Sequence, residues 1–136
     1  MTGSHSAARL TFEGRVERHE AVREALAALD RFGLQPRDRS RLAVIIEELL
    51  VNLYDHGGWQ QDSEAILEIV ANSDAVRLEL HDNGPGFDPR HADRTAPIPV
   101  RGGGAGLALV RTWAEELAYH PGPPFNRLSL AYALRS

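Results

Sequence analysis

The chain has 136 residues, a formal charge of −4 and no cysteine, and its 43% hydrophobic and 25% charged content is typical of a globular protein. A chain of this length forms one domain and buries roughly two-thirds of its unfolded surface. The acidic balance argues against direct binding of nucleic acid, and the lack of cysteine excludes disulfides, thiolate metal sites and cysteine nucleophiles. No apolar run approaches the roughly 18 residues of a membrane span and no signal pattern is present, so we expect a cytoplasmic protein without membrane attachment.

The first half of the chain predicts one strand and two helices. Leu10 to Val16 alternates between apolar and polar residues, as a half-buried strand does. Over Glu17 to Phe32, apolar residues recur at three- and four-residue spacing, which is typical of a helix, and Gly33 is suited to end it. The same spacing predicts a second helix from about Arg37 to His56.

The second half predicts a hairpin, a loop, a helix and a strand. Ala65 to Ala71 and Ala75 to His81 both alternate and are joined by a short polar turn, which is a hairpin signal. Asp88 to Gly103 carries three prolines and no period, which predicts a long loop with a function. Ala105 to Leu117 then reads as a helix whose buried face is formed by Leu109, Val110, Trp113 and Leu117, and Asn126 to Leu134 reads as the last strand.

This order of elements predicts an α/β (α+β) two-layer sandwich, in which helices cover one face of a mixed, mostly antiparallel sheet. The chain contains no internal repeat, low-complexity segment or linker. We therefore expect a single domain over residues 9–136, preceded by a flexible N-terminus at residues 1–8.

The end of the predicted hairpin carries the first candidate site. Asp82 leaves the strand and enters a turn that contains Gly84, Pro85 and Gly86. A buried aspartate at this position can accept a hydrogen bond from an amino group of a flat heterocycle, and the glycines allow the ring to lie against the backbone. Taken alone, the stretch is explained equally well as ordinary turn chemistry.

The second helix carries three polar residues beside its apolar stripe. Glu48, Asn52 and His56 are spaced at four-residue intervals, so they line one side of the helix. Asn52 offers an amide oxygen to Mg²⁺, which proteins hold with few oxygens plus phosphates and water, and Glu48 can act as a general base. Taken singly, Glu48 is more often a solvated charge, and His56 can simply cap the helix.

The third candidate stretch is the glycine run from Gly102 to Gly106, which opens the third predicted helix. Backbone N–H groups at a helix N-terminus bind phosphate oxygens, although a glycine run alone can be a flexible loop. The chain has no G-x-x-x-x-G-K-[ST] motif, and no glycine-rich turn follows its first strand, which argues against a P-loop or dinucleotide fold. Together, the three stretches predict a nucleotide site.

These motifs resemble, in order, those of the ATP-binding fold shared by gyrase, histidine kinases and related ATPases (the GHKL or Bergerat fold). They are Glu48-x-x-x-Asn52-x-x-x-His56 as the N box, Asp82-x-Gly84-x-Gly86 as the first glycine box and Gly104-x-Gly106-Leu107 as the second. The resemblance covers nearly the whole chain. The compact domain and the run from Gly103 to Arg111 are similar to the stand-alone anti-sigma-factor serine/threonine kinases and related stress-response regulators.

The resemblance implies roles for the matching positions. Asn52 would hold Mg²⁺, Asp82 would read the adenine amino group, and Glu48 would be the catalytic base. Residues 88–103 would form the ATP lid. The other residues expected to contact the nucleotide are His56, Gly84, Gly86, Arg101, Gly103, Gly104, Ala105, Gly106 and Leu107.

The resemblance further implies an ATP- and Mg²⁺-dependent serine/threonine protein kinase that regulates transcription in a stress response. It would switch partners by phosphorylating an anti-sigma antagonist and binding a sigma factor, and a homodimer through the first helix and first strand is expected. Phe125 and Asn126 stand where many relatives have glycine and threonine. Two alternatives remain open: a partner-sequestering ATP-binding module without kinase activity, and a detached histidine-kinase catalytic domain.

Overall fold

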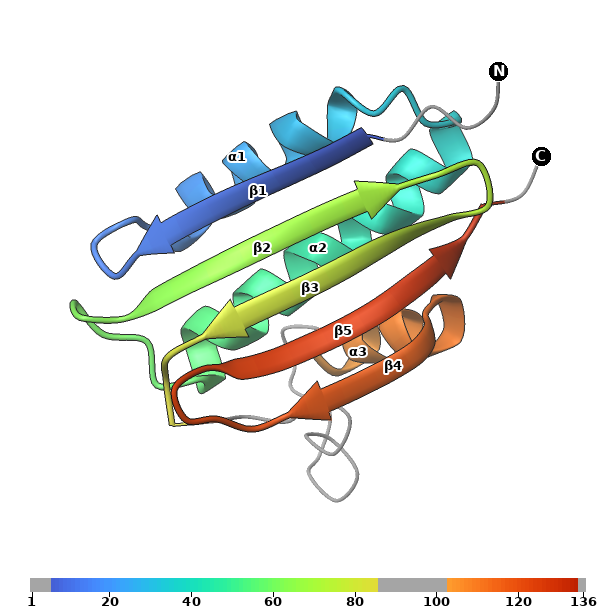
Figure 1. The fold of residues 1–136 in the computed structure, drawn as a ribbon. Helices are drawn as coiled ribbons and strands as arrows, with labels where there is room; N and C mark the ends of the chain where they lie inside the picture. The colour runs from blue at the N-terminus through green and yellow to red at the C-terminus, as the bar shows by residue number, and fades with distance from the viewer. Residues whose placement is uncertain (1–5, 86–102, 135–136) are drawn as a thin grey trace.

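A computed structural model of the chain describes residues 6–85 and 103–134. Within these residues, three helices cover one face of a five-stranded sheet whose other face is open, as Figure 1 shows. This arrangement confirms the predicted α/β two-layer sandwich. The strands are β1 (Ser6–Glu13), β2 (Glu64–Ala71), β3 (Ala75–Asp82), β4 (Glu115–His120) and β5 (Asn126–Ala133), and the helices are α1 (Arg18–Asp30), α2 (Pro36–His56) and α3 (Gly103–Trp113).

The strands lie in the order β1-β2-β3-β5-β4. All four pairings between the described strands are antiparallel, so the sheet is not the mixed one that we expected. The central strand β3 pairs along its whole length with β5 and from Val76 to Asp82 with β2. Because Asp82 ends β3 between these two neighbours, its side chain is held at a defined point on the sheet.

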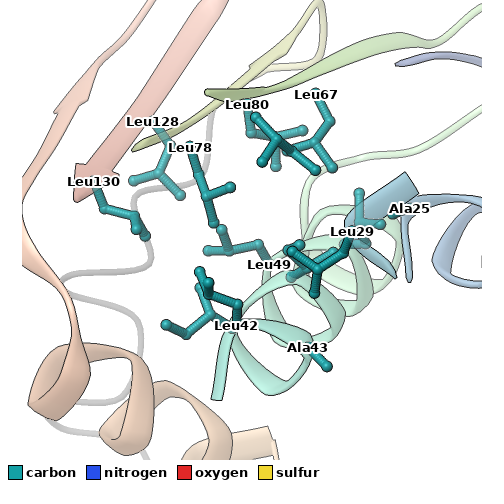
Figure 2. Close-up of a cluster of buried hydrophobic side chains, with 14 of the residues drawn as sticks. Ala25, Leu29, Leu42, Ala43, Leu49, Leu67, Leu78, Leu80, Leu128 and Leu130 are labelled. Atoms are coloured by element: carbon teal, nitrogen blue, oxygen red, sulfur yellow. The ribbon is translucent and has the colours of Figure 1, made fainter. Parts of the chain in front are cut away.

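The core lies between α2 and the helix-facing side of β2, β3 and β5 (Figure 2). Apolar residues of α2 recur every three or four positions and are almost fully buried, which confirms the predicted stripe. Alternate residues of the strands pack against them. The buried residues of this interface are Leu42, Ile45, Ile46, Leu49 and Leu53 from α2, and Leu67, Ile69, Leu78, Leu80, Leu128 and Leu130 from the sheet.

Strand β1 begins and ends earlier than the sequence pattern predicted. It starts at Ser6, so residues 6–8 pair with β2 although they fall in the segment expected to be a flexible terminus. It ends at Glu13, where the N–H of Val16 donates to the carbonyl of Glu13 in a turn. The alternation of apolar residues continues through this turn, which is why the pattern alone placed the strand too late.

The last helix is shorter than predicted, and a strand follows it. Helix α3 ends at Trp113, and Leu117 lies in β4 rather than on the buried face of a helix. Leu109, also expected to be buried, is 38% exposed. The backbone bends at Glu116, which has a φ of 53°, and the β4 register shifts between Glu115 and Ala118. Pairing with β5 therefore overrides the local helical pattern and covers an edge of the sheet.

Candidate functional site

A pocket opens between the C-terminal half of α2 and the strands β3, β4 and β5. Most of its lining is apolar, and Asn52 and Asp82 add polar groups from two of the three predicted motifs. An apolar pocket with a few polar groups is the usual form of a small-molecule site. The described residues that line it are Leu49, Asn52, Leu53, Gly57, Leu80, Asp82, Tyr119 and Leu128.

The side chain of Asp82 is held through one of its two oxygens. The backbone N–H of Gly84 donates to Oδ2 at 2.8 Å, and Nδ2 of Asn126 donates to the same oxygen at 3.2 Å. Burial raises the pKa of this carboxyl, and the two hydrogen bonds partly offset the effect. Both bonds from the described residues end on Oδ2, so Oδ1 is the oxygen that can accept an N–H from a ligand.

The turn after Asp82 packs tightly against the end of α2. A Cβ on Gly84 would lie 2.6 Å from the carbonyl oxygen of Gly57 and 3.0 Å from Oδ2 of Asp82. Gly58 has a φ of 74°, and a Cβ there would lie 2.8 Å from the ring of Pro85. Only glycine fits at position 84, because the end of α2 approaches it so closely. This contact holds the turn after Asp82 against Gly57, which lines the pocket.

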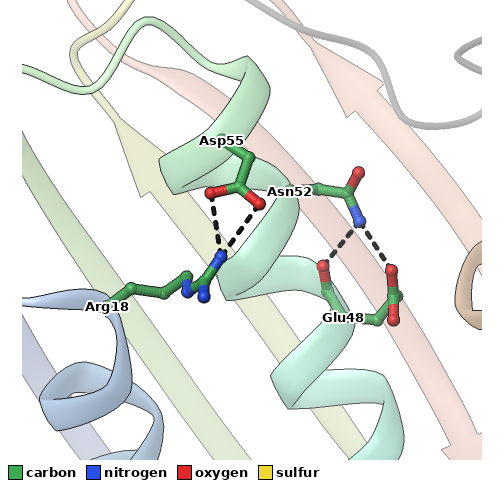
Figure 3. A network of polar contacts seen from close by, with 4 residues as sticks. All are labelled: Arg18, Glu48, Asn52 and Asp55. Atoms are coloured by element: carbon green, nitrogen blue, oxygen red, sulfur yellow. Dashed lines mark hydrogen bonds and ion pairs between the residues drawn. The ribbon is translucent and has the colours of Figure 1, made fainter. Parts of the chain in front are cut away.

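Asn52 and Glu48 form a hydrogen-bonded pair along one side of α2 (Figure 3). Nδ2 of Asn52 donates to the Glu48 carbonyl at 2.7 Å and to Oε2 of Glu48 at 3.0 Å, and Asn52 is only 6% exposed. Because the amide nitrogen is held in this way, the amide oxygen points away from Glu48, as Figure 3 shows. This oxygen is the atom that a hard cation would bind.

Glu48 itself is half-buried and contacts the pocket lining through Asn52. Burial raises the pKa of this carboxyl, the hydrogen bond from Asn52 lowers it, and the charge of Glu47 raises it again, with a net rise. A carboxylate with a raised pKa is a stronger proton acceptor than a solvated one. The pair can therefore combine a cation ligand with a base on one side of α2.

The remaining predicted residues are placed to different degrees. His56 is the last residue of α2, is exposed, and is not part of the pocket lining. The glycine run from Gly103 to Gly106, with Ala105 and Leu107, forms the start of α3, as expected for a helix N-terminus. Gly86, Arg101 and residues 88–102 of the predicted lid (88–103) lie outside the described residues, and Gly103, the last residue of that lid, is the first residue of α3.

Two residues of the site were missed by the sequence reasoning: Tyr119, which lines the pocket, and Asn126, which does not line it but binds Asp82. Tyr119 lines the pocket from β4, a strand that the sequence pattern did not reveal. Asn126 was noted only as a departure from the family pattern, but it is 4% exposed and hydrogen-bonded to Asp82. A buried amide at the start of a strand is a signal that could have indicated this role, because buried polar groups need partners.

A second group of polar side chains lies on the open face of the sheet. Glu68, Glu79 and His81 have ligand atoms within 4.8 Å of one another. Glu79 and His81 alternate along β3 with Leu78 and Leu80, which face the core. The group is therefore separated from the pocket by the sheet and is not part of the site described above.

A family model for the histidine kinase-like ATPase domain matches residues 12–132. The match includes every described residue of the pocket and the start of α3. No curated protein matches the chain. None of the helices within the described residues is long and apolar enough to cross a membrane.

Proposed function

The chain belongs to the histidine kinase-like ATPase domain family, and from this premise we propose that the pocket beside α2 binds the adenine ring of ATP. The observation that carries the proposal is the half-buried carboxylate of Asp82, which the described residues bond through Oδ2, so that Oδ1 can accept from a ligand. Leu80, Leu128 and Tyr119 supply apolar surface for a flat ring.

The carboxylate also accounts for a preference among nucleotides. Oδ1 of Asp82 is an acceptor, and adenine presents an amino group at the position where guanine presents a carbonyl oxygen. Guanine would place two acceptors against each other in a buried site, which costs about 1–3 kcal/mol or more for the groups left unpaired. We therefore expect ATP to bind better than GTP.

The groups around the pocket suit a Mg²⁺-loaded triphosphate. Asn52 would hold the metal through its amide oxygen, which faces away from Glu48. The backbone N–H groups at the start of α3 (Gly103–Trp113) would bind phosphate oxygens. When bound, Mg²⁺ would neutralise phosphate charge, and the chain's own residues would orient the nucleotide.

The proposed reaction is phosphoryl transfer from ATP to a serine or threonine hydroxyl of a protein. Glu48 would accept the hydroxyl proton as the new O–P bond forms, and the bond between the γ-phosphorus and its bridging oxygen would break to release ADP. The raised pKa of Glu48 supports this role. The resemblance of the motifs to anti-sigma-factor kinases supports an anti-sigma antagonist as the substrate and a sigma factor as the binding partner.

A second copy of the chain is also a proposed partner. Strand β1 lies at an edge of the sheet and pairs only with β2 among the described strands. An edge strand leaves backbone donors and acceptors available to another chain. We expect a homodimer that uses α1 and β1, which sedimentation of the purified protein would detect as twice the monomer mass.

The test of the nucleotide site is a calorimetric titration of ATP with and without Mg²⁺ into wild type and Asn52→Ala. We expect Mg²⁺-dependent binding that weakens roughly tenfold in the variant, because one metal ligand is lost. Asn72→Ala is the matched control, since it removes an exposed amide from the turn at the other end of β3. Equal affinity in wild type and Asn52→Ala would exclude Asn52 as a metal ligand.

The test of the reaction is radiolabelled phosphate transfer from ATP to a purified anti-sigma antagonist. Labelling on serine or threonine would support the kinase, and transfer to histidine would favour a histidine-kinase catalytic domain. ATP binding with no labelled product, together with partner binding in non-hydrolysable nucleotide, would identify a sequestering module instead.

A further inference from the structure

Asn126 is the first residue of β5 and lies opposite Asp82 in the β3–β5 register. Its side chain makes three hydrogen bonds in a nearly fully buried position. Nδ2 donates to Oδ2 of Asp82 at 3.2 Å and to the carbonyl of Gly84 at 2.9 Å, and Oδ1 accepts the backbone N–H of Gly122 at 2.7 Å. One amide therefore joins the end of β3, the turn after it and the loop before β5.

These contacts fix the orientation of the amide. An asparagine side chain has two N–H groups, and here one goes to Asp82 and the other to Gly84. The reversed orientation would place Oδ1 against a carboxylate and a carbonyl oxygen, and would place the N–H groups against the N–H of Gly122. Asn126 consequently has no donor left for a ligand, and its contribution to a ligand must pass through Asp82.

Building on the adenine pocket proposed above, we propose that Asn126 is a positioning residue that binds Oδ2 of Asp82, stabilises its negative charge and leaves Oδ1 for the base amino group. With Gly84, it supplies the two N–H groups that the described residues give to this carboxylate. Without Asn126, the carboxylate would keep one N–H donor and could turn either oxygen toward the pocket.

Among the described residues, few other groups carry a charge that could act on Asp82. Tyr119 of β4 is the only other titratable residue among the described residues that line the pocket, and Glu48 of α2 binds Asn52, which also lines it. Ala65 lies opposite Asp82 on β2 and carries no charge. Burial raises the pKa of Asp82, and the bonds from Gly84 and Asn126 lower it. A change at Asn126 should therefore register directly in the titration of Asp82.

The first test uses wild type alone, without nucleotide. The carboxyl carbon of Asp82 and the side-chain amide of Asn126 are followed by NMR as the pH is changed. We expect both signals to move with one common pKa, because the amide donates to the titrating oxygen. Amide signals of Asn126 that stay constant while Asp82 titrates would overturn the proposal.

The second test compares three variants by the same titration. Asn126→Leu removes every donor at similar volume, and Asn126→Asp adds a second carboxyl, so both should raise the pKa of Asp82 above its wild-type value. Asn126→Thr retains one hydroxyl donor and should keep the pKa near that of wild type. If Asn126 only fills space, the pKa of Asp82 should instead be the same in Asn126→Leu and Asn126→Thr.

Nucleotide binding gives opposite pH profiles for wild type and Asn126→Asp. Wild type should lose Mg-ATP affinity as the pH falls and Asp82 is protonated. In Asn126→Asp, a singly protonated pair can still donate one O–H to Oδ2, so affinity should fall at least tenfold as the pH rises and both carboxyls ionise. Parallel profiles would overturn the proposal, whereas failure of wild type to bind at any pH would refute the adenine function and leave the carboxyl titration to decide the role of Asn126.

Discussion

Asp38, which is buried, and Asp82, which is half-buried, lie at opposite ends of the layer between α2 and the sheet, and their surroundings differ. Asp38 lies in the first turn of α2, is 2% exposed, and accepts the hydroxyl of Tyr132 at 2.7 Å. Asp82 lies near the C-terminal end of α2, where the pocket is lined by Gly57. A helix favours negative charge at its N-terminus and disfavours it at its C-terminus, so only Asp38 has the support of the helix dipole.

The difference separates Asp38, an acid bonded within the fold, from Asp82, the acid that we propose binds the nucleotide. Asp38 accepts a hydrogen bond from Tyr132 and so connects α2 to β5. This bond compensates for the loss of water around the buried carboxylate. Asp82 has one oxygen bonded and the other facing no described donor, and burial raises its pKa. Among the described residues Glu48 has the same character, since its carboxylate accepts a hydrogen bond from Asn52 on Oε2 alone. Incompletely bonded carboxylates beside a pocket are the ones expected to meet a ligand.

The largest expected effect is on catalysis at Glu48. Glu48→Gln retains a partner for Asn52 but removes the proposed base, so the proposed phosphoryl transfer should fall about 10²–10⁴-fold while ATP affinity changes little. Steady-state transfer and calorimetry on the same preparation measure both quantities. Glu115→Gln is the control, because Glu115 is an exposed acid at the start of β4 and does not line the pocket. An equal loss of phosphoryl transfer in both variants would show that the loss does not come from removing the carboxylate of Glu48.

The next effect separates stability from binding at the structural acid. Tyr132→Phe leaves Asp38 buried without its hydroxyl donor, so the free energy of unfolding should fall by about 1–3 kcal/mol. ATP affinity should stay near that of wild type, because the pocket is at the other end of β3. Urea unfolding and calorimetry test the two statements. If Tyr132→Phe weakened ATP binding without lowering the free energy of unfolding, Asp38 could no longer be separated from Asp82 as an acid that serves stability alone.

A smaller effect concerns the pH dependence of stability. Since the pKa of Asp82 is higher in the folded protein than in the unfolded chain, its stabilising contribution is present below the unfolded-state pKa and is lost as the pH rises through the folded value. Asp82→Asn should therefore gain stability relative to wild type as the pH rises, and the difference should shrink toward about pH 4. Thermal unfolding of both proteins at a series of pH values measures this difference in stability. A stability difference that grows as the pH falls would contradict the prediction.

The smallest effect is expected at an exposed acid. Arg18 contacts both carboxylate oxygens of Asp55 at 3.0 and 3.1 Å, but both side chains are largely solvated. Arg18→Ala should lower the free energy of unfolding by less than about 1 kcal/mol and should lose that effect in high salt. Chemical unfolding at two salt concentrations is the measurement. If Arg18→Ala lowered the free energy of unfolding as much as Tyr132→Phe does, burial would not explain the order of these effects on stability.

Local patterns in the sequence were enough to place α2 and the end of β3. The 3.6-residue stripe of α2 set Glu48 and Asn52 on one side of the helix, and alternation set Asp82 at the end of its strand. Both signals are local, and the fold retains them. The conclusion that these groups share one site came from the order of the motifs.

Other features depend on distant partners and could not be read locally. Strand β4 exists because β5 offers an edge, so Tyr119 was missed with it. Asn126 gains its role from Asp82 and Gly84, which are more than forty residues away along the chain. These contacts decide which oxygen of Asp82 is bonded within the fold, and the spacing of residues in the sequence does not predict it.

The most direct test of the central claim is a calorimetric titration of Mg-ATP and Mg-GTP into wild type, Asp82→Asn and Tyr132→Phe. If Asp82 reads the adenine amino group, wild type and Tyr132→Phe should both prefer ATP, and Asp82→Asn should bind ATP roughly 100-fold more weakly, as expected for loss of a hydrogen bond to a buried charged group. Equal ATP affinity in wild type and Asp82→Asn, or equal affinity of wild type for ATP and GTP, would contradict the claim.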